Sequence, residues 1–351
     1  MANFGPKDIK KLRETTSAGM MDCKNALKET DGDFDAAIAW LREKGLGAAA
    51  KKASKVAAEG VVSVQVAADK AVIVEINSQT DFVAQNDVFK AVVSEITEHA
   101  FNNNLADADA INASEISGQA FSEYLSLKIA SIGENLVVRR AGMVVAENDT
   151  VAVNGYVHAN SQVAVLLSAD CEDAQTAKKV SAELKNVAMH AAAMSPSTLS
   201  YKDFDAQFVA DETAGRIEKV KKDNEELVRL GKPLKNVPAY VSMSQLTEEV
   251  LATAKSAIEA ELAAEGKPEQ IWDRIVPGKL ERYISDNTLL DQELALLDQK
   301  YVMDDSVTVA EHIAKVSGGK AQITKLIRLE VGEGIEVEEE DFAAEVAKQM
   351  A

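Results

Sequence analysis

The chain has 351 residues, of which 46% are hydrophobic and only 5% aromatic, so we expect cores built from Ala, Val, Leu and Ile. Its formal net charge of −19 argues against direct nucleic-acid binding, because a phosphate backbone repels such a surface, but it suits a protein partner with a basic patch. No apolar run approaches the roughly 20 residues that span a bilayer, and two distant cysteines exclude a disulfide framework, so a cytoplasmic location is expected.

The N-terminal residues 1–55 predict three short helices and a tether. Apolar residues recur at helical spacing in three stretches between residues 6 and 45, and Gly45 is expected to end the third helix. So few residues provide little core, and we expect a marginal, mobile module with Cys23 among its apolar positions. The Ala/Lys-rich stretch 47–55 has strong helix propensity and would tether the module.

Two later segments resemble each other. Residues 60–76 alternate between apolar and polar around a short turn, which predicts a hairpin with one buried face, and a helix over 87–100 follows. Residues 155–167 repeat the pattern, and a helix over 173–193 follows. We interpret the two units as a diverged internal repeat, which predicts a two-part α+β core with small antiparallel sheets.

Residues 201–279 predict long helices. A heptad-like seam runs over 213–227 and ends at a Gly-Lys-Pro sequence, while Ser242 and Gln245 form a capping box that is expected to start the next helix. We expect these two helices to form a projecting antiparallel coiled coil, although two helices of an ordinary bundle would give the same pattern. A last helix is expected over 338–350. The predicted division has five parts: residues 1–55, 56–141, 142–200 with 280–333, 201–279 and 334–351.

A search for catalytic chemistry finds no assembled site. Residues 45–50 match a dinucleotide-binding glycine pattern, but they follow a predicted helix where that motif requires a strand. The histidines show no metal-ligand spacing, and Cys171 lies in an acidic stretch without a nearby histidine. We therefore predict no catalytic residue, no metal site and no cofactor, with an enzyme that uses an unrecognised site as the alternative.

The candidate functional element is instead a polar connector over residues 77–86. It links the first predicted hairpin to its helix, and it contains the large apolar residues Phe82 and Val83. One interpretation tucks Phe82 under the sheet while Asp81 caps a turn. The other makes Phe82 an exposed apolar wedge beside a carboxylate, which is how a partner protein is gripped.

The run Leu12–Lys24 resembles the N-terminal signature of the elongation factor Ts family, and Asn77–Ala84 resembles its second signature. Further matches follow in the family's order at Ile132–Asn135, Arg139–Arg140, Tyr156–His158, Ala188–His190 and Glu330–Ile335. The resemblance implies a UBA-like three-helix module, a two-part α+β core, a protruding coiled coil and a C-terminal helical module. The segment from about 200 to 280 is longer than the usual family hairpin.

The resemblance also implies a function without enzymatic chemistry. Family members are guanine nucleotide exchange factors that bind elongation factor Tu, both GDP-bound and nucleotide-free, during translation elongation. By resemblance, the element that disturbs the Mg²⁺ site of elongation factor Tu consists of Thr80, Asp81, Phe82 and Val83. Other implied partner contacts are Met20, Met21, Lys24, Ile132, Gly133 and His158. A scaffold or adaptor that binds through its helical hairpin and N-terminal module is the competing hypothesis, and self-association stays open.

Overall fold

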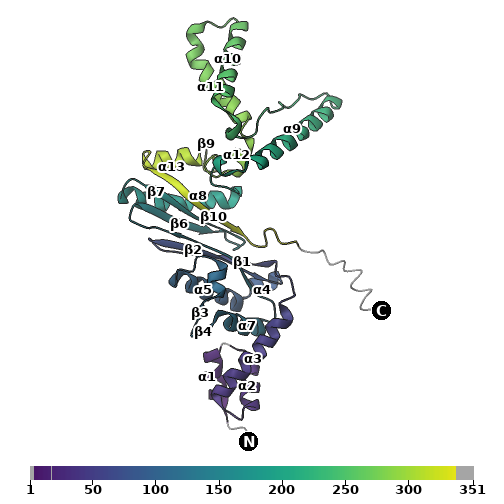
Figure 1. The fold of residues 1–351 in the computed structure, drawn as a ribbon, viewed down its shortest axis with the longest axis vertical. Coiled ribbons are helices and arrows are strands. Elements are labelled where there is room, and N and C mark those ends of the chain that lie inside the picture. The colour runs from purple at the N-terminus through teal and green to yellow at the C-terminus, as the bar shows by residue number, and fades with distance from the viewer. Residues whose placement is uncertain (1–3, 17, 337–351) are drawn as a thin grey trace. The chain divides into compact units, whose positions relative to one another are not determined.

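The computed structural model describes residues 4–16 and 18–336, and it combines helices with small antiparallel sheets, as an α+β protein does (Figure 1). Contacts divide the chain into two units. The first comprises the residues up to Ser168 together with those from Ile327 onward, and the second comprises Ala169–Leu326. The helix predicted over 338–350 lies outside the described residues, and the five-part division stays a prediction.

The N-terminal part contains the three predicted helices, although the third is longer than expected. Their bounds are α1 Pro6–Thr16, α2 Met20–Glu29 and α3 Phe34–Lys52. Leu12, Cys23 and Leu41 are buried in their shared core, which confirms the position of Cys23. Asp33 caps α3 by accepting a hydrogen bond from Ala36 N, and the helix then runs past Gly45, so the prediction that it ends there is wrong. The alanines and lysines that follow outweigh the glycine in helix propensity.

The stretch predicted to be a tether belongs mostly to α3, which packs along α7, Phe121–Ile132. Gly45 lies at this contact, where an added Cβ would come within 3.0 Å of Leu127 Cδ2. The absence of a side chain therefore allows the two helices to approach closely. A module joined to the core only by a linker is not what the structure shows.

The first sheet has the order β1-β2-β5, with antiparallel neighbours at each step. Its strands are β1 Glu59–Val66, β2 Lys70–Ser78 and β5 Val137–Val145. The hairpin is confirmed, but the prediction of a single buried face is wrong for β2. Val72, Val74 and Ile76 face a core that includes α5, whereas Ala71 and Ile73 pack in a second core on the opposite face. Helix α5 spans Asp87–Asn102.

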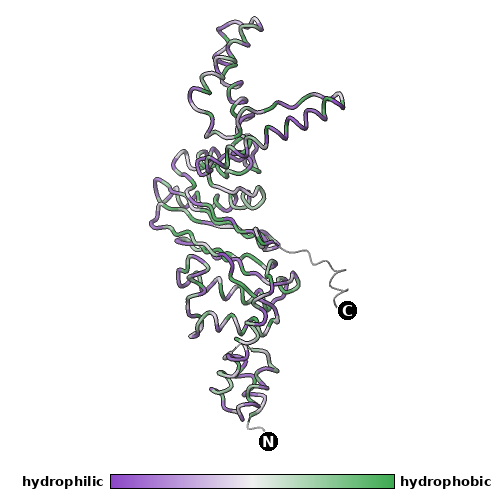
Figure 2. The backbone as a smooth tube through the Cα atoms, turned by 45° about the vertical axis from the view of Figure 1, so that its right-hand side comes forward, coloured by the Kyte–Doolittle hydropathy of each residue, from purple (hydrophilic) through white to green (hydrophobic). Residues whose placement is uncertain are grey.

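The second sheet has the order β10-β7-β6. Its strands are β6 Val151–Val157, β7 Val163–Cys171 and β10 Ala321–Glu330, and helix α8, Ala174–Met194, follows β7. Both predicted strand pairs are therefore present, each with its expected helix. In Figure 2 the strands are predominantly hydrophobic, because their side chains fill these cores. Smaller elements of the first unit are α4 Asp81–Gln85, α6 Ala108–Asn112, β3 Glu115–Ile116 and β4 Gln119–Ala120.

Long helices dominate the second unit, but they pair differently from the prediction. Their bounds are α9 Ala206–Arg229, α10 Glu248–Ala264 and α11 Trp272–Asp286. Helix α10 packs on α11, and Lys279 Nζ lies 2.9 Å from Glu261 Oε2 between them. Helix α9 is instead accompanied by the extended segment that follows it, where Asn224 Oδ1 accepts a hydrogen bond from Lys235 N. The structure thus does not form the predicted coiled coil from α9 and α10.

The capping box predicted at Ser242 and Gln245 is present, but it closes only a short 3-10 turn, η2 Met243–Gln245. Helix α10 begins later, where the Thr247 side chain accepts a hydrogen bond from Val250 N. Two caps in succession explain why the sequence placed the helix start too early. Further elements of this unit are η1 Tyr201–Asp203, η3 Glu269–Ile271, α12 Leu289–Leu294, β8 Lys300–Tyr301, β9 Asp304–Thr308 and α13 Val309–Ser317.

The fully buried His190 has a structural role in this unit. Its Nδ1 accepts a hydrogen bond from Val302 N at 3.1 Å, so Nε2 carries the proton and donates to Gln299 Oε1 at 3.0 Å. Burial lowers the pKa of His190, which keeps the ring neutral near pH 7. The histidine therefore holds the residues on either side of β8, Gln299 and Val302.

Asp298 gives the second unit a pH-dependent stability. Burial, assisted by the charge of Asp291, raises the pKa of Asp298 from 3.8 to about 6. A raised folded-state pKa means that this group stabilises the fold below its unfolded pKa and loses that contribution as pH rises through about 6. We expect Asp298→Asn to raise the free energy of unfolding at pH 7 by on the order of 1 kcal/mol, after allowance for solvent screening. Urea unfolding followed from pH 5 to pH 7.5 measures this gain.

The control for this prediction is Asp304→Asn, because hydrogen bonds from Ser306 lower the pKa of Asp304 and give its effect the opposite sign. The advantage of the Asp298 variant over the native chain should shrink as pH falls from 7 to 5. An advantage that is constant across this range would contradict the raised pKa.

Candidate functional site

Half of the polar connector expected over residues 77–86 is a short helix. Asp81–Gln85 form α4, two residues after the end of β2, and α5 begins after Asn86. Thr80 is the N-cap: its backbone is extended and its Oγ1 accepts a hydrogen bond from Val83 N at 3.3 Å. The prediction of a loop missed this turn of helix, because one turn is too short to establish a periodic pattern.

Helix α4 presents its residues to two different surroundings. Ala84 is buried and Val83 is partly buried in the core that includes α5, and these contacts attach the helix to the first unit. Phe82 points the other way and is 84% exposed, and Asp81 is exposed beside it. The interpretation that places Phe82 under the sheet is therefore wrong, and so is the one that makes Asp81 a cap. The structure leaves a large aromatic side chain in solvent on a well-defined helix.

Glu134 holds the N-terminal end of α4 from a distant part of the chain. Its Oε2 accepts hydrogen bonds from Gln79 N at 3.0 Å and Thr80 N at 3.1 Å, and its Oε1 accepts one from Thr80 Oγ1 at 2.7 Å. Gly133, with φ of 87°, ends α7 in the left-handed region and so turns the chain at the residue before Glu134. A non-glycine residue adopts this conformation only with strain.

Comparison with known proteins assigns the family. The model of the family described as "Elongation factor TS" matches residues 79–237 and 234–333 of this chain. The chain belongs to the elongation factor Ts family. Relatives named elongation factor Ts match over their full length: one from Sulfurovum sp. (strain NBC37-1) is 67% identical, covering 100% of both chains, and one from Helicobacter pylori (strain ATCC 700392 / 26695) is 50% identical with the same coverage. One from Aliarcobacter butzleri (strain RM4018) is 56% identical over 100% of this chain and 99% of the relative.

Membership of the elongation factor Ts family places the chain in translation elongation and implies nucleotide exchange on elongation factor Tu. In the described part of the chain, His, Cys, Asp and Glu side chains form no group of three that could hold a metal ion. Over the same residues, no helix is long and apolar enough to cross a membrane.

The other residues implied by the resemblance to elongation factor Ts lie on separate elements. Met20 and Met21 are 56% and 64% exposed at the start of α2, and Lys24 is exposed one turn later. His158 is exposed after β6, where its Nδ1 lies 3.3 Å from the hydroxyl of Tyr156. Ile132, the last residue of α7, and Gly133, its C-cap, are the ones that the structure brings near α4, through Glu134.

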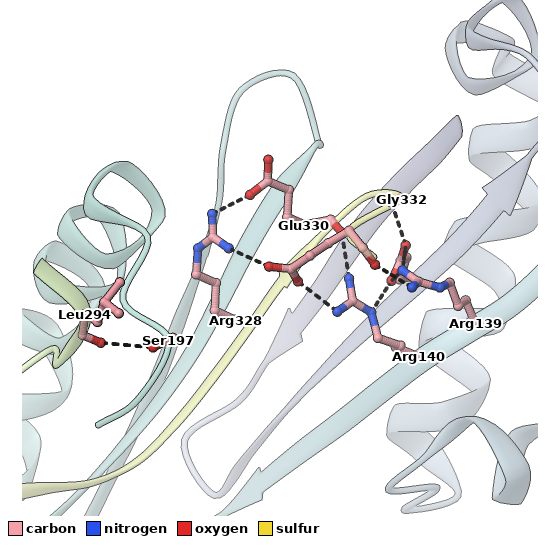
Figure 3. Close-up of polar contacts among 9 residues, drawn as sticks. Arg139, Arg140, Ser197, Leu294, Arg328, Glu330 and Gly332 are labelled. Carbon is pink, nitrogen blue, oxygen red and sulfur yellow. Dashed lines mark hydrogen bonds and ion pairs between the residues drawn. The ribbon is translucent and has the colours of Figure 1, made fainter. Parts of the chain in front are cut away.

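A buried carboxylate joins two of the sequence matches to elongation factor Ts. Glu75, at the middle of β2, is fully buried and accepts hydrogen bonds from Arg139 Nη1 at 3.1 Å and from Gly332 N at 3.0 Å. Arg140 also pairs with Glu75, and its Nη2 donates to Glu330 O (Figure 3). These contacts attach the segment after β10 to the first sheet.

Sequence reasoning missed both Glu134 and Glu75. Each lies far along the chain from its partners: Glu134 is 54 residues from Thr80, and Glu75 is 257 residues from Gly332. The only available signal was position, because Glu134 lies inside one matched motif, and the partners of Glu75 lie inside two others.

Proposed function

We propose that this chain binds GDP-bound elongation factor Tu and accelerates GDP release by disturbing its Mg²⁺ site with Thr80, Asp81, Phe82 and Val83. The single observation that carries the proposal is the exposure of Phe82, 84%, on a helix that is otherwise anchored. An exposed aromatic side chain on a rigid support is a typical anchor of a protein interface. A monomeric protein gains nothing in stability from it.

The proposed mechanism uses displacement rather than chemistry. Mg²⁺ requires near-ideal octahedral coordination, and it neutralises the phosphate charge of the bound nucleotide. A side chain wedged between the elements of the GTPase that carry the Mg²⁺ ligands shifts those ligands. The shift weakens the binding of GDP. Asp81 adds a negative charge at the same place. Linkage then requires that GDP with Mg²⁺ weaken binding of this chain by the same factor, and that nucleotide-free elongation factor Tu bind most tightly.

We further propose that the remaining residues are partner contacts without a part in displacing the ion. Met20, Met21 and Lys24 offer two exposed apolar side chains and one cation on α2. His158 offers an exposed imidazole on the turn between β6 and β7. The UBA-like character of the N-terminal module and a cytoplasmic location are parts of the same proposal.

Stopped-flow release of a fluorescent GDP from elongation factor Tu tests the function directly. We expect the chain to raise the release rate by about 10- to 100-fold, the range typical of allosteric coupling. Because nucleotide and exchange factor are linked, excess Mg²⁺ with GDP should dissociate the complex. Binding that leaves the release rate unchanged would favour the scaffold hypothesis, and failure to bind elongation factor Tu would refute the exchange function.

A further inference from the structure

The matched motif Ile132–Asn135 contains a charged residue, Glu134, whose role the proposed mechanism does not use. Its carboxylate is half-buried, and all three of the hydrogen bonds described above come from Gln79 and Thr80, the two residues before α4. Both carboxylate oxygens are engaged. A charged acceptor of this kind forms stronger hydrogen bonds than a neutral one.

Helix α4 is too short to hold itself in place. A helix of five residues is far below the length at which helices persist in water, because nucleation is unfavourable. Its N-terminal amides also lack helical partners. The hydroxyl of Thr80 satisfies one of them, Val83 N, while donating its own proton to Glu134. Glu134 therefore orients the lone pair of the Thr80 hydroxyl toward the helix that it caps.

We propose that Glu134 is a positioning residue for Phe82: it fixes the N-terminal end of α4, so that the exposed ring is presented in one orientation. The inference rests on the proposed function. Ala84 secures the other side of α4 to the core, and Ser78 Oγ donates to Thr80 O at 3.1 Å, so Glu134 completes the restraint from the α7 side. The Phe82 side chain can displace elements of the partner only if α4 itself does not move. Ordering one mobile residue on binding would lower affinity by about tenfold.

Gly133 sets the direction of this contact. Its backbone N donates to Ile129 O at 2.8 Å as α7 ends, and its φ of 87° turns the chain there. An added Cβ at Gly133 would meet no atom within 4 Å. Substitution with alanine therefore strains the backbone without a steric clash. Gly133→Ala thus displaces the Glu134 carboxylate without removing it.

The experiment compares the full chain with Glu134→Ala, Glu134→Gln and Gly133→Ala in stopped-flow GDP release from elongation factor Tu. We expect Glu134→Ala to lower the maximal release rate at saturating concentration by about tenfold, which corresponds to the loss of a charge-assisted hydrogen bond. Glu134→Gln should recover much of the rate. Its amide oxygen still accepts from the two backbone amides, but its NH₂ group cannot accept from the Thr80 hydroxyl.

A second readout does not depend on elongation factor Tu. Fluorophenylalanine placed at position 82 reports the mobility of the ring through its ¹⁹F line width in the free chain. We expect a narrower line in Glu134→Ala and Gly133→Ala than in the parent. Glu123→Ala is the matched control, because Glu123 lies on α7, the helix that precedes Glu134, and pairs with Arg42 of α3. Its line width and maximal release rate should equal those of the parent.

The outcomes are distinguishable. An unchanged fluorine line and an unchanged maximal rate in Glu134→Ala, even with a lowered melting temperature, would overturn the inference and leave Glu134 a merely structural residue. If Glu134→Ala does not fold, the same two measurements on Gly133→Ala decide. If the parent chain fails to accelerate GDP release, the proposed function is wrong, while the fluorine line still decides whether Glu134 immobilises α4.

Discussion

Replacing Phe82 with alanine is expected to abolish most of the acceleration of GDP release from elongation factor Tu, because a central aromatic anchor of an interface contributes about 2 kcal/mol, a factor of about 30. The stability of the folded chain should be almost unchanged. The ring is 84% exposed, so its removal leaves no cavity, and the free energy of unfolding should change by less than about 0.5 kcal/mol. Stopped-flow release and urea unfolding, measured on the same preparations, separate the two quantities.

Val228→Ala is the matched control for Phe82→Ala, because Val228 is a large apolar residue, 63% exposed, on α9 of the second unit. Its release rate should equal that of the parent. A Phe82→Ala chain that releases GDP at the parental rate would eliminate the wedge, although binding through other surfaces would survive that result.

Removing the carboxylate of Glu75 is expected to have the largest effect on stability. Glu75→Ala leaves Arg139 and Arg140 without their shared buried partner and deprives Gly332 N of its acceptor. Breaking a buried ion pair by deleting one partner costs about 3–5 kcal/mol, because the remaining charge stays desolvated. Urea unfolding measures the loss. Hydrogen exchange at the Gly332 amide should accelerate as the segment after β10 detaches from the sheet.

Two variants calibrate this expectation. Glu75→Gln retains the shape and one acceptor but not the charge, so it should lie between the parent and the alanine variant. Glu98→Ala removes an exposed glutamate from α5 of the same unit and should change the free energy of unfolding by less than about 0.5 kcal/mol. A loss below about 1 kcal/mol for Glu75→Ala would mean that the two arginines find water or other partners instead.

Local pattern predicted the strands well and their surroundings poorly. Alternation over residues 60–76 gave the β1–β2 hairpin, but alternation alone does not reveal that a central strand has cores on both faces. Val74 and Ile73 are equally apolar, and only the tertiary structure assigns them to opposite cores. The same limit applies to α9, since the seam over 213–227 predicted an apolar stripe but not the chain segment that lies along it.

The site shows a sharper division between what sequence can and cannot provide. The resemblance to the elongation factor Ts family identified Thr80 to Val83, whereas the physical reading of those residues left the exposure of Phe82 open. The resemblance included Glu134 in a matched motif but gave it no role, and the physical reading gave it none either. A hydrogen bond between residues 54 positions apart depends on where α7 ends, and nothing in the local sequence around Thr80 reveals that.

The packing of α3 on α7 has a consequence for how a partner would be held. Glu134, which holds α4, follows the C-terminal end of α7, while α3 belongs to the same small core as α2 with its exposed methionines. A partner that contacts both α2 and α4 would therefore bind two surfaces that are fixed relative to each other, and not two surfaces joined by a flexible linker. The second contact would then form at a high effective concentration, and the complex would dissociate only when both contacts release together.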